Sequence, residues 1–345
     1  GTSAIHAMCR IAGLGPGDAI IAPAYTFLAT ATPFAYEGVE VVFADADRYG
    51  NVTAATLAAK LGPTVRAVIV THMWGNPCPM DEIVAFCRAH QLLLLEDCSH
   101  AHFAAWRGQR VGTFGDMAVF STNQKAITTG EGGVLVTADD RYRELALLFG
   151  HYNKRCQTEI DPAAEHYPYA FTGMGLKHRI TTLGAAIGVH QLANAPDIET
   201  RRRALLSRYV TALTGNPVVT PAVLPDSDAS HGLYVLGLRF RPEGATVSRD
   251  EFVALCHAEG AVELDAPGST RDISTEPLFA RRDPLAPWRL TTPPLAERPS
   301  VDRHPGVATF ARTFLKLPLW GYPGDDAYVS GYLDALVKVS AAVAR

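Results

Sequence analysis

Short apolar runs that alternate with helix-like segments constrain the fold of this chain more than any other feature. Residues 67–71 (AVIVT) are rich in β-branched side chains, and residues 92–95 are four leucines. Between them, residues 80–90 have the spacing of an amphipathic helix. Strands that are apolar on both sides need cover on both faces, which a parallel sheet between helical layers provides. We therefore predict an α/β fold in which ligands bind beyond the carboxyl ends of the strands.

The length and the order of the predicted elements indicate two domains. A chain of 345 residues exceeds the size at which a single core keeps growing. Helices are predicted over residues 28–36 and 54–61, and a long helical stretch over residues 180–213. Residues 217–230, which contain prolines and aspartates, are predicted to be a hinge. The predicted division is a large domain over residues 1–215 and a small α+β domain over residues 230–345, with a strand at 262–264.

Composition excludes several classes of function. The formal charge is −4 and no basic stripe occurs, so nucleic acid is not an expected partner. No apolar run approaches the ~20 residues of a membrane span. The six cysteines are scattered without a CxxC pair, which favours reduced thiols, a cytoplasmic location and no zinc site. The chain begins at Gly1 without an initiator methionine, and we expect further residues before it.

One lysine, Lys125, lies in a segment without other positive charge, residues 120–133. Residues 118–120 and 134–137 have the composition of strands, and a glycine-rich turn follows the lysine, so Lys125 is predicted to lie on a loop between two strands. A lysine held in this way can form a Schiff base with an aldehyde cofactor such as pyridoxal phosphate. A loop lysine by itself is most often a solvated charge, so this interpretation depends on residues elsewhere.

Asp97 follows the leucine strand and is the second candidate. An acidic residue there is often a turn former, but a carboxylate against a pyridine nitrogen keeps the ring protonated and makes the cofactor an electron sink. His72, His100 and His102 gather in the same region. Because no cysteine pair or helical i,i+4 spacing accompanies them, no metal is predicted.

The amino-terminal residues allow two interpretations. Thr2 and Ser3 are good helix N-cap residues, and Ile5 and Met8 follow at helical spacing. The same helix start could bind a phosphate through its free N–H groups and its dipole. Residues 13–17 resemble a dinucleotide loop, but the third glycine is absent and a strand follows the segment rather than preceding it, so a Rossmann dehydrogenase is a poor fit.

Taken together, these motifs resemble the DegT/DnrJ/EryC1/StrS aminotransferases, the sugar and aminocyclitol branch of the fold-type I pyridoxal-phosphate enzymes. The resemblance runs over nearly the whole chain. The matching segments are residues 1–4 (GTSA), 15–18 (GPGD), 23–27 (PAYTF), 72–75 (HMWG), 96–101 (EDCSHA), 115–116 (GD), 130–133 (GEGG) and 317–319 (LPL). It implies an aspartate aminotransferase-like fold, with a large, mainly parallel sheet domain and a small α+β carboxyl-terminal domain.

The resemblance also implies roles for single residues. Lys125 resembles the Schiff-base lysine, which would act as general base and acid once displaced, and Asp97 the partner of the pyridine nitrogen. His100 stands where the family has a Gln or His near the phenolic oxygen of the cofactor. Phe27 matches the aromatic residue that stacks on the pyridine ring. The cofactor implied is pyridoxal 5'-phosphate, with pyridoxamine 5'-phosphate as intermediate.

The phosphate of the cofactor has its own implied partners. These are the backbone N–H groups of Thr2 and Ser3 and the hydroxyl of Ser121. Lys177 stands where many relatives have an asparagine that reaches the phosphate in the neighbouring subunit, which implies a homodimer with shared active sites. Two features depart from the family: four positions rather than five separate Ser121 from Lys125, and Phe103 replaces a common glycine.

The predicted function is transfer of an amino group from glutamate or glutamine to a keto sugar, usually nucleotide-linked, or to a keto-cyclitol, in amino-sugar or antibiotic biosynthesis. A pyridoxal-phosphate dehydratase or lyase acting on a similar sugar is the first alternative. It is disfavoured because such relatives replace the lysine with His. A non-catalytic, cofactor-binding regulator is the second alternative. The acceptor pocket is expected to involve residues 151–169 and 268–279.

Overall fold

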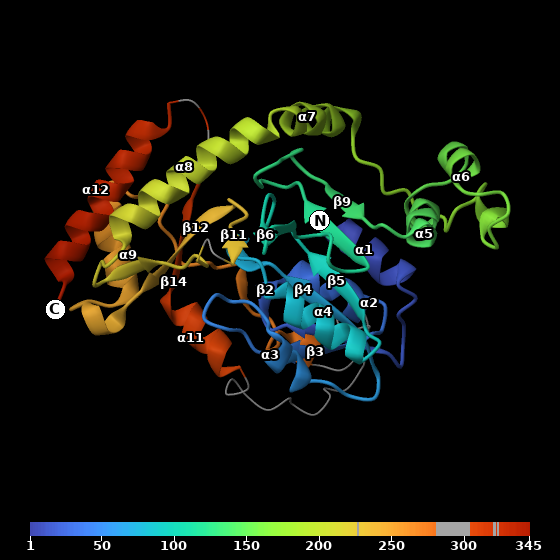
Figure 1. Ribbon diagram of the computed structural model, residues 1–345, viewed down its shortest axis with the longest axis horizontal. Coiled ribbons are helices and arrows are strands. Elements are labelled where there is room, and N and C mark those ends of the chain that lie inside the picture. Colours follow the sequence, from blue (N-terminus) through green and yellow to red (C-terminus); the bar gives the residue numbers. More distant parts are fainter. Residues whose placement is uncertain (226–227, 281–303, 320–321, 323) are drawn as a thin grey trace.

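The computed structural model describes residues 1–225, 228–280, 304–319, 322 and 324–345. A six-stranded sheet forms its centre, in the order β3-β1-β4-β5-β8-β9 (Figure 1). Neighbouring strands are parallel except β8 and β9, which are antiparallel. The strands are β1 (Ala19–Pro23), β3 (Glu40–Ala44), β4 (Val65–Thr71), β5 (Leu93–Asp97), β8 (Met117–Ser121) and β9 (Gly133–Val136). The predicted mainly parallel α/β sheet is confirmed.

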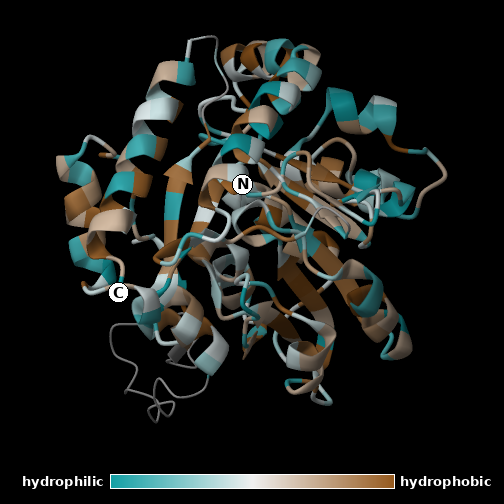
Figure 2. Cartoon of the chain, turned by 60° about the vertical axis from the view of Figure 1, so that its left-hand side comes forward, coloured by the Kyte–Doolittle hydropathy of each residue, from teal (hydrophilic) through white to brown (hydrophobic). Residues whose placement is uncertain are grey.

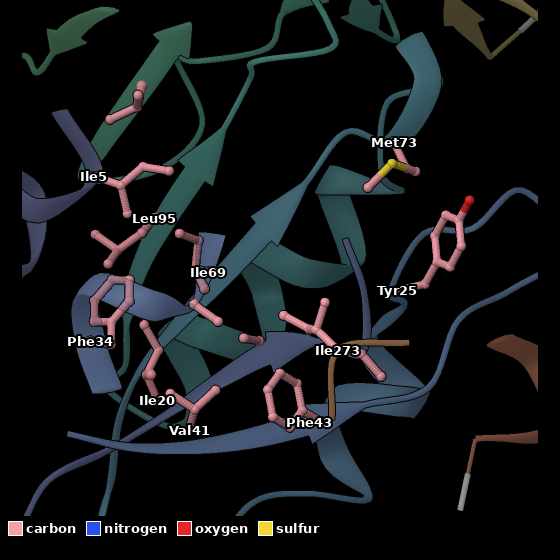
Figure 3. Close-up of a cluster of buried hydrophobic side chains, with 14 of the residues drawn as sticks. Ile5, Ile20, Tyr25, Phe34, Val41, Phe43, Ile69, Met73, Leu95 and Ile273 are labelled. Atoms are coloured by element: carbon pink, nitrogen blue, oxygen red, sulfur yellow. The ribbon is translucent and has the colours of Figure 1, made fainter. Parts of the chain in front are cut away.

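Alternating side chains of the central strands enter two separate cores, as the two-residue period of a strand requires. Ile20 and Leu95 face α1 (Thr2–Ile11) and α2 (Thr32–Tyr36), and Figure 3 shows them with Ile5 and Phe34. Ile21, the next residue of β1, enters the opposite core with side chains of α3 (Ala54–Ala58) and α4 (Met80–Ala89). The interior strands are accordingly brown in Figure 2, whereas the helices mix brown and teal.

The helices lie near the positions that the sequence predicts, but two of them are shorter than predicted. The predicted helix at residues 28–36 is broken into the 3-10 turn η1 (Leu28–Thr30) and α2, and the one at 54–61 ends at Ala58. The irregular segment 151–169 contains α6. The other helices of the large domain are α5 (Asp140–Gly150), α6 (Lys154–Glu159), α7 (Thr182–Ala193) and α8 (Ala195–Leu213), with the 3-10 turns η2 (Met73–Gly75) and η3 (Tyr167–Tyr169).

A second sheet carries the carboxyl-terminal part of the chain. Its antiparallel strands are β10 (Val219–Pro221), β12 (Val235–Phe240) and β14 (Phe314–Pro318), in the order β10-β12-β14. Its other elements are the 3-10 turn η4 (Pro242–Gly244) and the helices α9 (Arg249–Ala258), α10 (Pro277–Ala280), α11 (Pro305–Thr313) and α12 (Asp326–Val343). The predicted strand at 262–264 is wrong, because within that stretch the backbone turns, and only Asp265 forms an isolated bridge to Lys316.

The segment 217–230, which stays a predicted hinge, is strand in part. It contains β10, and β11 (Ala229–Ser230) pairs with β6 (Ala105–Trp106), which in turn pairs with β7 (Gln109–Arg110). The carboxyl-terminal half of α8 packs into the second core through Leu206 and Tyr209. The long helix α8 runs from α7 to the second core along the upper part of Figure 1. The division at residues 215 and 230 stays a prediction.

Candidate active site

A cavity of about 660 Å³ lies beyond the carboxyl ends of β4 and β5, between the large sheet and the second sheet. This is the edge where a doubly wound sheet is expected to hold its ligand. The sequence-predicted residues that line it are Thr2, Phe27, Asp97, His100, Ser121 and Lys125. Ser3 and Lys177 are exposed and do not line it. Two other hollows, of about 740 and 730 Å³, are more open to solvent and contain none of these residues.

Asp97 is a buried carboxylate at the end of β5 with a donor on each oxygen. The hydroxyl of Thr30 donates to Oδ2 at 2.7 Å, and the backbone N–H of Ser99 donates to Oδ1 at 3.0 Å. Only 4% of Asp97 is exposed. A buried carboxylate needs such partners, because an unpaired charge in this environment is strongly destabilising. Asp97 is therefore held in one orientation with part of its surface facing the cavity.

Lys125 is half-buried on the loop between β8 and β9, as predicted. Backbone and side-chain bonds close this loop: Thr129 N–H donates to Thr122 O at 2.8 Å, and the Thr128 hydroxyl donates to the same oxygen at 3.0 Å. Gln124, directly before the lysine, has φ +46°. The Nζ atom of Lys125 lies 4.1 Å from the centre of the Tyr234 ring, within the range of a cation–π interaction.

His100 is the middle ring of an aromatic stack. Its ring centre lies 4.9 Å from Trp74 and 4.4 Å from Tyr234. Burial lowers the pKa of His100 well below its ordinary value, and Lys125 and His102 add to the effect. The imidazole is therefore neutral at pH 7. Its Nδ1 atom is buried and has no hydrogen-bond partner among the described residues, so it can exchange a hydrogen bond with a group bound in the cavity.

The first turn of α1 lies against Ser121. Thr2 and Ser3 belong to the helix, and its N-cap is Gly1, which has no side-chain cap hydrogen bond. The cap predicted at Thr2 and Ser3 is therefore wrong by one position. A Cβ atom on Gly1 would lie 2.9 Å from the Cβ of Ser121, so glycine permits this close approach. Unpaired N–H groups at the start of a helix and a nearby hydroxyl suit an anion such as phosphate.

His72, Glu96 and Cys98 bring their ligand atoms together on the far side of β5. The ring of His72 is already engaged: Nδ1 accepts from the backbone N–H of Cys78 at 3.0 Å, and Nε2 lies 3.2 Å from Glu96 Oε2. Glu96 also accepts from three backbone N–H groups, those of Gly112, Phe114 and Gly115. Burial raises the pKa of Glu96, but His72 and these N–H groups lower it more, so the net pKa is lowered. His72 and Glu96 form a buried hydrogen-bonded pair with structural partners, and the absence of a metal site stays a prediction.

Comparison with known proteins decides between the families that such a cavity could serve. The sequence model of the DegT/DnrJ/EryC1/StrS aminotransferase family matches residues 1–292. The chain belongs to this family. The predicted family, fold class and enzyme class, a pyridoxal-phosphate aminotransferase, are confirmed.

Two curated proteins are similar in sequence to this chain. GDP-perosamine synthase of Caulobacter vibrioides is 34% identical over 293 residues, which cover 84% of this chain and 72% of the relative. Spore coat polysaccharide biosynthesis protein SpsC of Bacillus subtilis is 34% identical over 251 residues, covering 72% of this chain and 64% of that protein. Among solved structures, an aminotransferase from Psychrobacter cryohalolentis aligns with TM-score 0.85 and 25% identity, over 99% of this chain and 86% of that one.

The cavity fits pyridoxal phosphate. Lys125 offers an amine, Asp97 a carboxylate and Phe27 a ring that is 41% exposed at the cavity wall. The unpartnered Nδ1 of His100 and the close approach of Gly1 to Ser121 are what a bound polar ring with a phosphate would use. The individual roles of these residues stay predictions. The cofactor would supply an electron sink, and the protein would hold and orient it.

Among the cavity residues that sequence reasoning missed are Thr30, Trp74 and Tyr234. Thr30 follows the recognised segment 23–27 directly, so that segment was the signal that could have found it. Trp74 lies in the quoted segment 72–75, but nothing local indicates that its ring stacks on His100. Tyr234 precedes β12 of the second sheet and reaches the site only through the packing of the two sheets.

Proposed function

We propose that the protein transfers an amino group from glutamate or glutamine to a keto sugar, with a nucleotide-linked keto sugar favoured over a free keto-cyclitol. The observation that carries the proposal is a lysine amine in the same cavity as a buried carboxylate held on both oxygens. The curated relatives support the acceptor class, since the name of one gives a GDP-linked product and that of the other polysaccharide biosynthesis. An amino sugar for an antibiotic is one product of this class.

The residues of the cavity have separate proposed roles in binding the cofactor and in moving the proton. Asp97 would hold the ring nitrogen of the cofactor protonated, and Phe27 would cover one face of the ring. Lys125, released when the amino donor takes its place, would act as general base and acid, taking the proton from the α-carbon of the donor and delivering it to the former aldehyde carbon of the cofactor. His100, neutral in its buried stack, would hold the phenolic oxygen through Nδ1. Thr2, Ser3 and Ser121 would bind the phosphate.

The assembly that we propose is a homodimer in the cytoplasm. The α7 surface, defined by Ile180, Leu183, Ile187, Val189 and Leu192, exposes between 44% and 80% of each of these apolar side chains. Patches of this kind on a single chain mark interaction surfaces. The exposed Lys177 is positioned five residues before Thr182, where α7 begins, so a second copy on the α7 surface would bring its Lys177 within reach of this cavity. The six cysteines are all free and buried, which suits a reducing compartment.

The acceptor pocket that we propose differs in part from the predicted one. Ser269 and Thr270 of the predicted segment 268–279 line the cavity, with β13 (Thr270–Asp272) paired to β2 (Tyr25–Phe27). Within the described chain, no residue of the segment 151–169 lines it. We propose that this segment contributes to the cavity of the second copy, because its Tyr152 and Tyr169 are exposed. The rest of the pocket, in particular residues 281–303, lies outside the described residues.

A panel of keto acceptors with glutamate and glutamine as donors tests the proposal. Purified protein loaded with pyridoxal phosphate should convert at least one nucleotide-linked keto sugar to a product in which one oxygen is replaced by an amino group and a hydrogen, as read from its mass. One amino product should form for each keto acid released. Ammonia and a deoxygenated sugar without an amino product would identify a dehydratase. Cofactor binding without a half-reaction on any donor would identify a regulator.

A further inference from the structure

Three threonine hydroxyls meet beside Asp97 in the buried part of the cavity wall. Thr26 belongs to β2, Thr30 to η1 and Thr71 to the end of β4. The Thr26 and Thr30 oxygens are 2.8 Å apart, and the Thr71 oxygen lies 3.2 Å from that of Thr26 and 3.4 Å from that of Thr30. Their exposed fractions are 0%, 1% and 4%, so bulk water does not compete for these hydroxyls.

The direction of this hydroxyl network follows from counting protons. Each threonine hydroxyl has one proton to donate. That of Thr30 goes to Asp97 Oδ2 at 2.7 Å. For Thr26 and Thr71, the only side-chain acceptors found in the described chain are the other threonine oxygens. Whether Thr71 donates to Thr26 or directly to Thr30, the chain of donors ends at the carboxylate.

A chain of donors that all point one way strengthens its last bond. Each hydroxyl that accepts a hydrogen bond becomes a better donor, and the low dielectric of the interior enhances the effect. The last bond here has an ionised acceptor and is of the strong, charge-assisted type. The other oxygen of Asp97 accepts only the backbone N–H of Ser99 among the described residues, at 3.0 Å. Thr30 is therefore the side chain that determines both the orientation of the carboxylate and how much negative charge it offers to the cavity.

We propose that Thr30, supported by Thr26 and Thr71, is a positioning residue that sets how firmly Asp97 keeps the proton on the ring nitrogen of the cofactor. This inference rests on the proposed function. A carboxylate that gives up part of its charge to Thr30 is a weaker base and leaves the proton on the ring. Without the hydroxyl, the carboxylate is the stronger base, draws that proton toward itself and can also rotate.

The test is a series of isosteric substitutions, each loaded with pyridoxal phosphate that carries ¹⁵N at the ring nitrogen. The ¹⁵N chemical shift reports the proton on that nitrogen, and titration of cofactor-free protein reports affinity. Thr30→Val should move the shift toward that of an unprotonated pyridine and weaken cofactor binding about tenfold. Thr26→Val and Thr71→Val should act in the same direction and progressively less. Thr30→Ser, which keeps the hydroxyl, should restore the wild-type shift.

Several outcomes decide the matter. Loss of packing alone does not move the ¹⁵N signal, and Ser340→Ala controls for it, because it removes a buried hydroxyl of α12 that has no hydrogen-bond partner among the described residues. A wild-type ¹⁵N shift in Thr30→Val overturns the inference. If that variant does not fold, an unchanged shift in Thr26→Val overturns it equally. Wild-type protein that fails to bind the cofactor at all would instead overturn the proposed function.

Discussion

The edge of the sheet at Asp97 and the α7 surface differ in how complete they are within one chain. At the edge, both oxygens of a 4%-exposed carboxylate are satisfied, by Thr30 and by the Ser99 backbone. On α7, Leu183 is 80% exposed and Val189 69%, although both are apolar. The difference teaches that one copy of the chain completes the surroundings of Asp97 but leaves the apolar side chains of α7 uncovered. The proposed dimer would cover those side chains with a second surface.

The largest effect on amino transfer is expected for Lys125, which lies in the same cavity as Asp97. Lys125→Ala removes both the amine that joins the cofactor and the proton carrier, and should lower amino transfer by more than about 10⁴-fold. Loss of the visible absorbance of the lysine-bound cofactor, together with a donor assay, measures it. Lys338→Ala, at an exposed lysine of α12, is the matched control and should keep wild-type turnover. A Lys125→Ala protein with normal turnover would remove Lys125 from the mechanism.

The α7 surface is tested by placing a charge in it. Leu183→Glu should weaken self-association by about a hundredfold, because an unpaired carboxylate would be buried at the proposed contact. Light scattering over a concentration series measures the effect. Val262→Glu, at a residue that is 63% exposed and lies outside the α7 surface, should leave the assembly unchanged. Equal assembly of both variants would mean that a second copy does not cover α7.

Two buried histidines, His231 and His102, should make the free energy of unfolding depend on pH. Burial lowers the pKa of His231 from 6.5 to about 4, and burial likewise lowers the pKa of His102 to about 4. Because the unfolded chain binds more protons in this window, these residues stabilise the fold fully above pH 6.5. The free energy of unfolding should decrease by about 3 kcal/mol for each as the pH falls from 6.5 to 4.

Urea unfolding of the wild type and of His231→Asn, at several pH values, measures this loss. The substitution should flatten the slope between pH 6.5 and 4, since asparagine keeps an acceptor for Leu233 N–H but does not titrate. The two proteins compared at pH 8 give the cost of the substitution itself. An unchanged slope would show that His231 does not contribute to it.

The smallest effect is expected for Lys177, which tests whether the α7 surface and the cavity at Asp97 act together. Lys177→Ala should weaken cofactor binding about tenfold, provided that Lys177 of one copy reaches the phosphate in the other. In the Leu183→Glu background the same change should have no further effect, because that contact would already be lost. Cofactor titration of the single and double variants measures it. Additive losses in the double variant would place the effect of Lys177 within its own chain, where its Nζ lies 5.6 Å from the Tyr152 ring.

Local sequence patterns located the strands and the chemical groups of the site well. The apolar runs gave β4 and β5, and the lysine loop lies between β8 and β9 as expected. Hydrogen bonds across long separations were not predictable in this way: Thr30 and Asp97 are 67 residues apart, and the parallel order of β1, β4 and β5 in the sheet contributes to bringing their segments together. The strands within residues 217–230 were missed for a related reason. The prolines of this segment indicate turns, but pairing with β12 and β6 makes parts of it strand.

Phe103 shows how packing overrides a local preference. The sequence has phenylalanine where the family commonly has glycine, and the residue adopts φ +69°, a conformation that favours glycine. Its ring packs against the second core. Arg110 and Arg203 both donate to its carbonyl oxygen. These contacts offset the backbone strain, and neither arginine is near Phe103 in sequence.

The sequence by itself determined the alternation of strands and helices, and with it the edge of the sheet at which an amine and a carboxylate would meet. These follow from side-chain periodicity and from turn residues, which act over a few positions. Only the tertiary structure decided which hydroxyls support Asp97, that Tyr234 of the second sheet covers Lys125, and that the apolar side chains of α7 remain uncovered. Such contacts depend on how distant segments pack, and no local pattern of residues encodes that.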